Sequence, residues 1–182
     1  MEFIIPESRH SSQEKAMTQK NYTDRDDDPI ERAREFLTRD DDERWRAGEW
    51  MSTLLPHLNV TSADPSAPAR VTFSFTCLDH HCNRLGNLHG GAAATLFDLC
   101  TTMPLVLISK PGFWQFLGVT RNLNVSYFRP VPKGEEVVIE TEAVQVGKRL
   151  ATLKGVMRRK RDGEIVSICE HLKANIDPEP KI

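Results

Sequence analysis

The sequence lacks a surplus of positive charge, basic residues in its first seven positions and a long uninterrupted hydrophobic run. It has 24 Lys and Arg against 26 Asp and Glu, a formal net charge of −2, and its basic residues are not interleaved with aromatics, which disfavours nucleic-acid binding. The longest apolar stretch is interrupted by Asp98 and Pro104, and a membrane-spanning helix needs roughly 18 or more apolar residues. The N-terminal residues Met-Glu-Phe-Ile-Ile-Pro-Glu include no basic segment, unlike a signal peptide. We therefore expect no membrane span and a cytoplasmic protein, with mitochondrial and peroxisomal compartments left open.

Cysteine is also scarce, and no strong metal-binding motif is present. The four cysteines are Cys77, Cys82, Cys100 and Cys169, and without a secretory context we expect reduced thiols in the core. The run His80-His81-Cys82 offers metal ligands, but no second ligand pair follows at a useful spacing. We interpret this run as part of a polar loop and expect no metal and no cofactor.

The chain divides into an N-terminal extension and one folded domain. Its 182 residues, of which 39% are hydrophobic, suffice for one sizeable core. Residues 1–28 are polar and charged, which predicts a disordered arm. Residues 29–55 predict two helices, the first opening at Pro29 behind an Asp28 cap and the second running from about 41 to 54 over the sheet edge. Residues 56–178 form the main domain.

A long apolar helix is predicted at the centre of that domain. From Gly91 to Ile108 the residues are apolar on nearly every face, which is typical of a helix surrounded by protein. Asp98 lies in its middle, where a buried, unpaired carboxylate costs several kcal/mol. Either Asp98 lies on the surface of the helix, or the cost is offset by a functional use of the carboxylate.

Five segments around this helix have the features of strands. Residues 71–77 alternate apolar and polar side chains, as do residues 122–127. Residues 135–146, 149–158 and 164–174 follow, with a tight Asp162-Gly163 turn before the last. We therefore expect an α+β fold in which an antiparallel sheet wraps around one long helix.

The beginning of the central helix is suited to binding an oxyanion. Gly90 and Gly91 present unpaired first-turn N–H groups at the positive end of the helix dipole, and without side chains they allow close approach. Asp98 lies eight residues beyond Gly90, which is about 12 Å along the axis at 1.5 Å per residue. If both act on one atom, the carboxylate comes from a second copy, and the site lies at a dimer interface.

These residues also form a recognisable signature. The pattern Asn83-x-x-Gly-x-x-His89-Gly-Gly, followed nine residues after its His by Asp98, resembles that of the hotdog-fold acyl-CoA thioesterases of the PaaI-like type, the thioesterase superfamily. The resemblance covers roughly residues 45–176 and continues in Gly118-Val-Thr-Arg-Asn-Leu-Asn-Val-Ser-Tyr-Phe-Arg-Pro130 and Val146-Gly147-Lys148. It implies a hotdog fold and hydrolysis of an acyl-CoA thioester to free acid and CoA in lipid metabolism. It also implies homodimers that often pair into homotetramers.

Each residue of the signature has a catalytic interpretation beside a structural one. Asp98 is expected to be either the base that activates water or the nucleophile that forms an anhydride, and the resemblance favours water activation. The Gly90 N–H is the expected oxyanion donor, with Gly91 beside it in substrate binding. Asn83 either polarises the carbonyl or caps a loop. His89 either caps the helix or faces the leaving sulfur.

The remaining candidates lie further along the chain. The resemblance places Thr120 where a hydroxyl helps to hold the water, although an exposed strand threonine is an equal alternative. Arg129, Lys148 and Arg149 are candidates for binding CoA phosphates. The run 158–161 is interpreted as a solvated hairpin tip.

Two other functions remain open at this stage. A hotdog hydratase or dehydratase would need a His/Asp pair directed at the acyl α and β carbons, which this motif does not supply. A non-catalytic acyl-CoA-binding protein is the other alternative.

Overall fold

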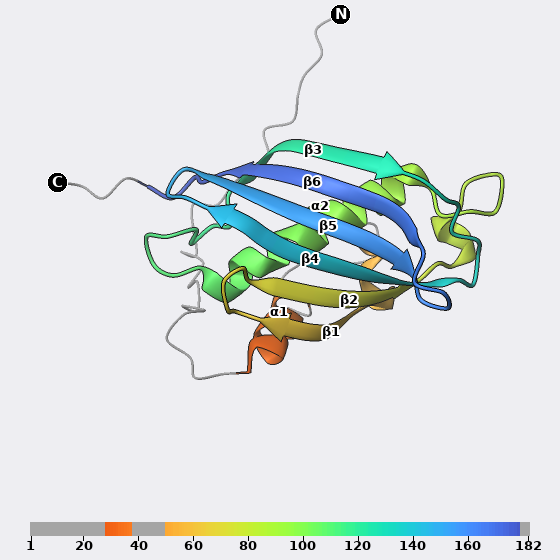
Figure 1. Ribbon diagram of the computed structural model, residues 1–182, viewed down its shortest axis with the longest axis horizontal. Helices are drawn as coiled ribbons and strands as arrows, with labels where there is room; N and C mark the ends of the chain where they lie inside the picture. The colour runs from red at the N-terminus through yellow and green to blue at the C-terminus, as the bar shows by residue number, and fades with distance from the viewer. Residues whose placement is uncertain (1–27, 38–49, 179–182) are drawn as a thin grey trace, which may run out of the picture.

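A computed structural model describes residues 28–37 and 50–178, in which one long helix is wrapped by a six-stranded antiparallel sheet (Figure 1). The predicted arm lies outside the described residues except for Asp28, and so does most of the predicted second helix. The helices are α1 (Pro29–Leu37) and α2 (Gly90–Ile108). The strands are β1 (Leu58–Asp64), β2 (Arg70–Thr76), β3 (Val119–Tyr127), β4 (Glu136–Val146), β5 (Leu150–Arg159) and β6 (Ile165–Ala174).

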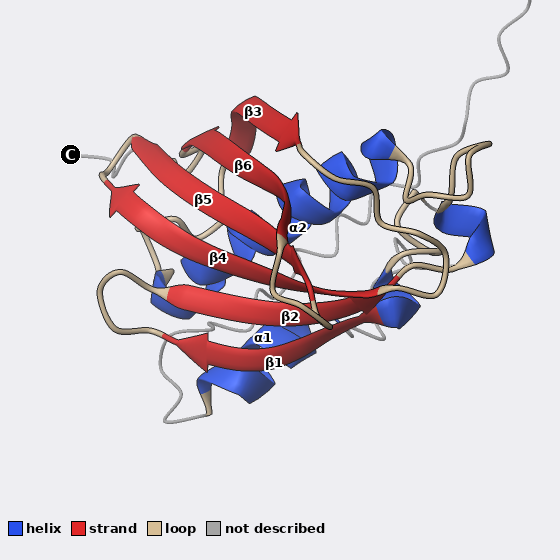
Figure 2. Ribbon diagram, turned by 45° about the vertical axis from the view of Figure 1, so that its right-hand side comes forward, coloured by secondary structure: helices blue, strands red, loops and turns tan. Residues whose placement is uncertain are grey.

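The strands are ordered β1-β2-β4-β5-β6-β3, and every neighbouring pair is antiparallel. Both α-helices lie on the same side of the sheet, with α2 behind the central strands and α1 near β1 (Figure 2). The expected α+β hotdog architecture is thus confirmed. One strand was missed: β1 has only two buried hydrophobic residues, Leu58 and Val60, so its alternation is too short to stand out in the sequence.

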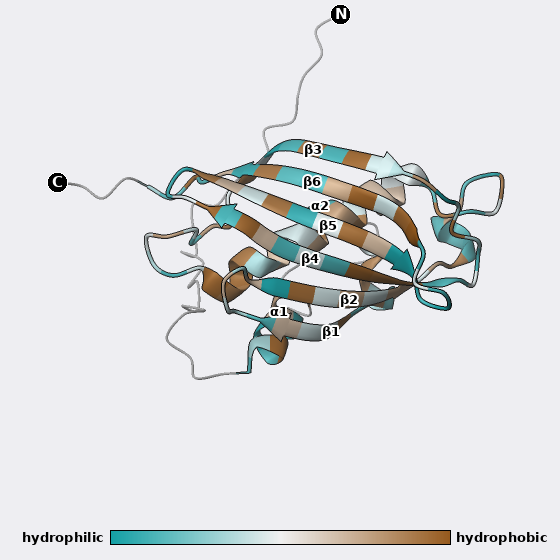
Figure 3. Ribbon diagram, in the orientation of Figure 1, coloured by the Kyte–Doolittle hydropathy of each residue, from teal (hydrophilic) through white to brown (hydrophobic). Residues whose placement is uncertain are grey.

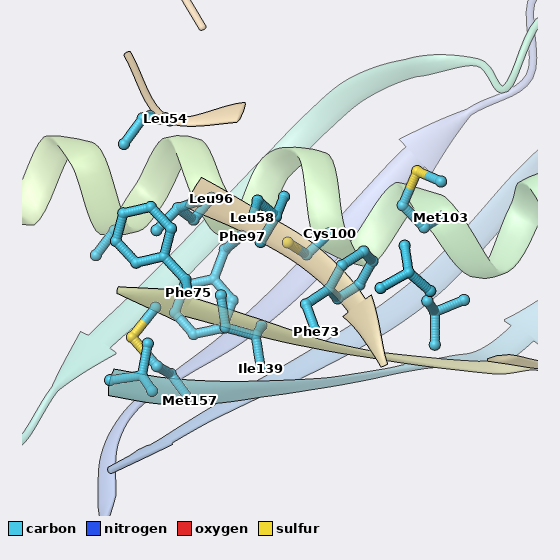
Figure 4. Close-up of a cluster of buried hydrophobic side chains, with 14 of the residues drawn as sticks. Leu54, Leu58, Phe73, Phe75, Leu96, Phe97, Cys100, Met103, Ile139 and Met157 are labelled. Atoms are coloured by element: carbon cyan, nitrogen blue, oxygen red, sulfur yellow. The ribbon is translucent and has the colours of Figure 1, made fainter. Parts of the chain in front are cut away.

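The core fills the space between the sheet and α2. Hydropathy alternates along the strands, as Figure 3 shows, because successive side chains point to opposite faces. Phe73 and Phe75 of β2 pack with Phe97 of α2, and all three are fully buried (Figure 4). Burying such a side chain contributes about 1.5–3 kcal/mol. All four cysteines are free thiols, and all except the half-buried Cys82 are buried.

The central helix is only partly surrounded by protein, which corrects the expectation of burial on nearly every face. Its C-terminal half, from Cys100 to Leu107, is buried, whereas Gly91 is exposed and the Asp98 side chain keeps 50% of its surface. One face of the N-terminal half is therefore open to solvent in the single chain. By length and composition alone α2 could cross a membrane, but 61% of the stretch is buried inside the molecule, which is typical of a core helix.

The N-terminal elements agree only in part with the sequence-based expectation. α1 begins as predicted, with the Ile30 N–H donating to Asp28 Oδ1 at 2.9 Å. Residues 50–54, predicted as the end of a second helix, instead form turns that lead into a short 3₁₀ helix at Leu55–His57. Pro56 explains the difference, because it lacks an N–H and disfavours helical backbone at the preceding residue.

Candidate active site

The carboxylate of Asp98 lies at the centre of a hydrogen-bonded group that joins three elements. Thr120 of β3 donates its hydroxyl to Asp98 Oδ1 at 2.6 Å, and the same hydroxyl lies 2.9 Å from Nε2 of His171 on β6. His171 Nε2 is also 3.5 Å from Asp98 Oδ1, and its Nδ1 is 2.7 Å from the Thr101 hydroxyl. We call Asp98, Thr120 and His171 the Asp98 cluster. It connects a half-exposed carboxylate to a fully buried imidazole.

His171 is held in its neutral form. Burial lowers its pKa to about 4, and the positive charge of Lys173 acts in the same direction, against the opposing effect of Asp98. The neutral ring carries one N–H. Thr101 donates its own hydroxyl to the Phe97 carbonyl at 2.6 Å, so Nδ1–H donates to the Thr101 oxygen and Nε2 faces the Thr120 hydroxyl as an acceptor. The Thr120 hydroxyl therefore lies between two acceptors, Asp98 Oδ1 and His171 Nε2.

A buried lysine lies beside this cluster. Lys173 of β6 donates from Nζ to the Thr102 hydroxyl at 3.1 Å, and Thr102 in turn donates to the Asp98 backbone carbonyl at 2.7 Å. Burial lowers the pKa of Lys173, and the charge of Asp98 raises it. The Lys173 ammonium group and the Asp98 carboxylate are therefore close enough to attract each other.

Three of the other predicted residues, Asn83, Gly90 and Arg129, line a separate cavity at the N-terminal end of α2. This Gly90 cavity has a volume of about 390 Å³, within the range typical of small-molecule sites. It is lined by Asn83, Leu85, Asn87, Leu88, Gly90, Ala93, Tyr127, Phe128, Arg129, Pro130, Val131, Met157, Val166 and Ser167. Asn83 and Gly90, predicted to act on the same carbonyl, are therefore brought together. Asp98 and Thr120 are not part of this lining.

The side chains at the entrance of α2 have structural contacts. Asn83 Oδ1 accepts from the N–H groups of Leu85 and Asn87 at 2.9 and 3.3 Å, which shapes the loop before the helix. His89 is the N-cap, and its Nδ1 accepts from the Gly91 N–H at 2.9 Å. The Gly91 donor is therefore occupied. Within the described part of the chain, the Gly90 N–H and the Asn83 amide nitrogen have no hydrogen-bond partner.

Tyr127 closes one side of the Gly90 cavity. Its hydroxyl donates to the Gly90 carbonyl at 2.8 Å, and a Cβ added at Gly90 would lie 3.6 Å from the Tyr127 ring. This spacing is ordinary van der Waals contact, so a small side chain fits there. Burial raises the pKa of Tyr127, with a further contribution from Cys169, and the phenol therefore stays protonated and able to donate.

The basic residues proposed for CoA binding are not gathered at one place. Arg129 lines the Gly90 cavity, where its guanidinium contacts the Ile165 carbonyl at 3.0 Å and Glu164 at 3.1 Å. Lys148 and Arg149 occupy the β4–β5 turn at the opposite end of the sheet (Figure 1). Met157 lies eight positions beyond Arg149 along β5, which is about 26 Å at roughly 3.3 Å per residue. One chain cannot bring all three to one substrate atom.

The charged run 158–161, at the end of β5, behaves as the solvated hairpin tip that its sequence indicates. Arg158 pairs with Glu140 at 2.9 Å, Lys160 with Glu136 at 2.7 Å, and Arg159 with Asp162 at 2.9 Å. These ion pairs are mostly exposed and contribute little to stability individually. The Asp162-Gly163 turn is confirmed, with Gly163 at a φ of +72°.

Three histidines lie together near the end of β2, and one of them, His81, accepts the His89 N–H on its carbonyl at 2.8 Å. The ligand atoms of His57, His80 and His81 lie within 4.8 Å of one another. Both ring nitrogens of His81 are engaged, however, since Nδ1 accepts from the Leu78 N–H at 3.0 Å and Nε2 bonds the Thr53 carbonyl at 2.7 Å. A metal ion would have to displace one of these bonds.

Sequence reasoning did not identify His171, Lys173 or Tyr127 as site residues. His171 and Lys173 alternate with exposed residues on β6, and both point toward α2. Ionisable residues at inward positions of a strand were the available signal, because they are costly to bury without a use. Tyr127 was included in the predicted strand without a role.

The geometry defines a class before any comparison: a hotdog fold with an acidic residue on the central helix and backbone donors at the beginning of that helix. Residues 85–166 match the family model described as the thioesterase superfamily. Acyl-coenzyme A thioesterase 13 from Mus musculus is 32% identical over 108 residues, which are 59% of this chain and 74% of that protein, and the Homo sapiens protein matches equally.

Solved structures agree with these matches. The crystal structure of thioesterase superfamily member 2 from Mus musculus is 26% identical, with a TM-score of 0.67, and the match covers 81% of this chain and 98% of that one. The phenylacetic acid degradation protein PaaI from Thermus thermophilus is 20% identical, with a TM-score of 0.58 and coverage of 70% and 98%, and it supports the fold alone. The chain belongs to the thioesterase superfamily, and its enzyme class is thioester hydrolase.

Proposed function

We propose that the protein is an acyl-CoA thioesterase that hydrolyses an acyl-CoA to the free acid and CoA. The observation that carries the proposal is the 2.6 Å hydrogen bond from Thr120 to the Asp98 carboxylate, which is half exposed and backed by a neutral His171. A carboxylate held in this way can accept a proton from a water molecule that the Thr120 hydroxyl helps to orient. The matched relatives are named as acyl-coenzyme A thioesterases, which supports CoA as the thiol.

The reaction uses the two groups of residues for different tasks. Asp98 removes a proton from water as the water oxygen forms a bond to the thioester carbon. The Gly90 N–H and the Asn83 amide donate to the carbonyl oxygen as it becomes negative. The tetrahedral intermediate then collapses, the C–S bond breaks, and the proton held by Asp98 passes to the departing CoA thiolate. The acid and free CoA are released without a metal or redox step.

Two copies of the chain are required for both groups of residues to act on one substrate. Gly90 and Asp98 of one chain are about 12 Å apart along the helix axis, at 1.5 Å per residue. β3 is an edge strand that pairs only with β6 among the described strands, and Val119 and Tyr127 are exposed at its two ends. An unpaired edge of this kind favours pairing with another strand. In the proposed dimer, Asp98 and Thr120 of one chain face the Gly90 cavity of the other, forming two equivalent sites.

Release of free thiol from a graded series of acyl-CoA thioesters tests the function. The purified protein should produce free CoA and acid in equal amounts from at least one member of the series. A protein that binds acyl-CoA without thiol release under any of these conditions would contradict the proposal and favour a non-catalytic role.

A single turnover in water enriched in heavy oxygen distinguishes the two roles of Asp98. If Asp98 activates water, the label enters the acid product and the enzyme stays unlabelled. Label found in the Asp98 carboxylate would instead show attack through an anhydride, with water then cleaving that anhydride at the aspartyl carbon.

A further inference from the structure

One buried hydroxyl in the described part of the chain has no hydrogen-bond partner. Ser167 of β6 is 2% exposed, and its Oγ is the one such side-chain nitrogen or oxygen without a partner among the described residues. Leaving a buried hydroxyl unpaired is unfavourable, because it loses the hydrogen bonds that it makes with water in the unfolded chain. An apolar residue at position 167 would avoid that loss. We therefore expect the Ser167 hydroxyl to find its hydrogen-bond partner in a molecule other than this chain.

Ser167 itself lines the Gly90 cavity. Ser167 lies on the inward face of β6, in line with the buried Cys169 and His171 that also face α2, and it is part of the cavity lining. Its strand neighbours are Tyr127 of β3 and Met157 of β5. Tyr127 in turn hydrogen-bonds the Gly90 carbonyl, so Ser167 and the proposed oxyanion donor are both neighbours of Tyr127 in the cavity lining.

The cavity has a polar entrance and an apolar interior. Arg129 and Asn87 lie at its rim, whereas Met157, Val166 and Ala93 are buried in its wall. The charged CoA portion cannot enter the apolar interior without losing its hydration. With the thioester carbonyl at Gly90, the acyl chain is the part of the substrate that extends past Ser167.

We propose that Ser167 is a specificity residue whose hydroxyl hydrogen-bonds an oxygen substituent on the acyl chain. The substrate class that follows is the hydroxyacyl-CoA thioesters, which the enzyme prefers over plain acyl-CoA thioesters of the same length. This inference rests on the proposed thioesterase function. The physical reason is that a plain acyl chain leaves the Ser167 hydroxyl unpaired, whereas a hydroxyacyl chain pairs it.

The test compares three thioesters of equal chain length: hexanoyl-CoA, 3-hydroxyhexanoyl-CoA and 6-hydroxyhexanoyl-CoA. For the full-length protein, kcat/KM for at least one hydroxyacyl thioester should exceed that for hexanoyl-CoA by roughly fivefold to tenfold, the effect of one net hydrogen bond. In Ser167→Ala this ratio should fall to about one. In Ser167→Cys it should take an intermediate value, because a thiol is a weaker donor of similar size.

Thr152→Ala is the matched control. Thr152 lies on the exposed face of β5, and its loss should change neither the rates nor the ratio. Removal of an unpaired hydroxyl should leave the melting temperature of Ser167→Ala equal to that of the parent or slightly higher. A ratio that is the same in Ser167→Ala and the parent overturns the proposal, and so does a parent enzyme without preference for either hydroxyacyl thioester.

Binding of non-hydrolysable thioether analogues separates this inference from the proposed function. Calorimetry with S-hexyl-CoA and its hydroxylated counterparts should show tighter binding of one hydroxylated analogue, and this difference should be lost in Ser167→Ala. Absence of thiol release from every thioester would refute the thioesterase function itself. Hydrolysis of hexanoyl-CoA without any effect of the hydroxyl or of Ser167 would overturn the specificity alone.

Discussion

Asp98 is the residue whose environment best explains the site, because its neighbours combine a hydroxyl donor, a neutral imidazole and a buried ammonium group. Thr120 and His171 approach the carboxylate from β3 and β6, and Lys173 lies on the same face of β6 as His171. Its half-exposed position also leaves one side of the carboxylate accessible to water. A general base must be within hydrogen-bond reach of the proton that it removes, and this exposure allows a water molecule to come that close.

The substitution Asp98→Asn preserves the volume of the side chain and removes the base. We expect kcat for acyl-CoA hydrolysis to fall by at least about 100-fold, the usual contribution of general-base catalysis. The matched control is Glu170→Gln, an exposed carboxylate on the outer face of β6, which should retain the parent rate. Parent-level turnover by purified, folded Asp98→Asn would show that the base is another residue.

His171 should make the stability of the protein dependent on pH in the acidic range. Its pKa is lowered from 6.5 to about 4 in the folded protein, so the unfolded chain binds more protons between these values. The free energy of unfolding should therefore fall as the pH is lowered from about 6.5 to about 4. Denaturant titrations should show a smaller pH dependence for His171→Gln than for the parent.

Part of that pH dependence should remain in His171→Gln. Burial also lowers the pKa of His81, which contributes with the same sign. His80→Gln, at the exposed position next to His81, serves as the control for loss of a surface histidine. An unchanged pH dependence in His171→Gln would mean that its imidazole is not held neutral by the fold.

At the scale of secondary structure elements, the distance between α2 and the sheet is set by a glycine. Gly155 of β5 lies beneath the helix, where an added Cβ would come within 2.7 Å of Phe97 and 2.9 Å of Thr101. Thr101 hydrogen-bonds His171. The close approach of α2 to β5 therefore also fixes the hydrogen-bonded neighbours of Asp98.

Gly155→Ala should push the helix away from the sheet. We expect a loss of about 1–3 kcal/mol in the free energy of unfolding, as is usual for overpacking a core, together with a lower kcat. Chemical denaturation and thiol-release assays measure the two effects. Lys154→Ala changes the neighbouring outward-facing residue and should affect stability little. Equal stability of Gly155→Ala and the parent would contradict this tight packing.

At the scale of the whole molecule, the two groups of site residues lie apart in a single chain. The Gly90 cavity lies at the N-terminal end of α2, and the Asp98 cluster lies about two helical turns further along. β3 presents its free edge beside them. Association of two chains along this edge would bring the Gly90 cavity of one chain next to the Asp98 cluster of the other.

Mixing two inactive variants tests this sharing. Gly90→Val shields the N–H donor, and a Cβ at this position is in ordinary contact with Tyr127, so the variant should fold. When dimers are re-formed from Gly90→Val and Asp98→Asn chains, each heterodimer should regain about one of its two sites. Heterodimers that are shown to form but stay inactive would contradict a shared site, as would an active monomer in sedimentation experiments.

The sequence by itself determined the elements and the types of residue in the site. Apolar periodicity predicted α2, β2 and the three strands β4, β5 and β6, and the spacing of Asn83, Gly90 and Asp98 identified the family. These features are local, because hydrophobic alternation and turn chemistry are read over a few neighbouring residues. The same local rules missed β1, whose apolar signal is short, and extended a helix through residues 50–54 up to Pro56.

Only the tertiary structure decided which residues face Asp98. The sequence shows an inward histidine and lysine on β6, but the register between β3 and β6 and the rotation of α2 place His171 and Thr120 against the carboxylate. Those contacts join residues separated by 22 to 73 positions in the chain. Their geometry depends on core packing around Phe97 and Gly155, and packing of this kind is a cooperative property of the whole fold. The same packing left the Ser167 hydroxyl without a partner in the Gly90 cavity, which no pattern in the sequence indicates.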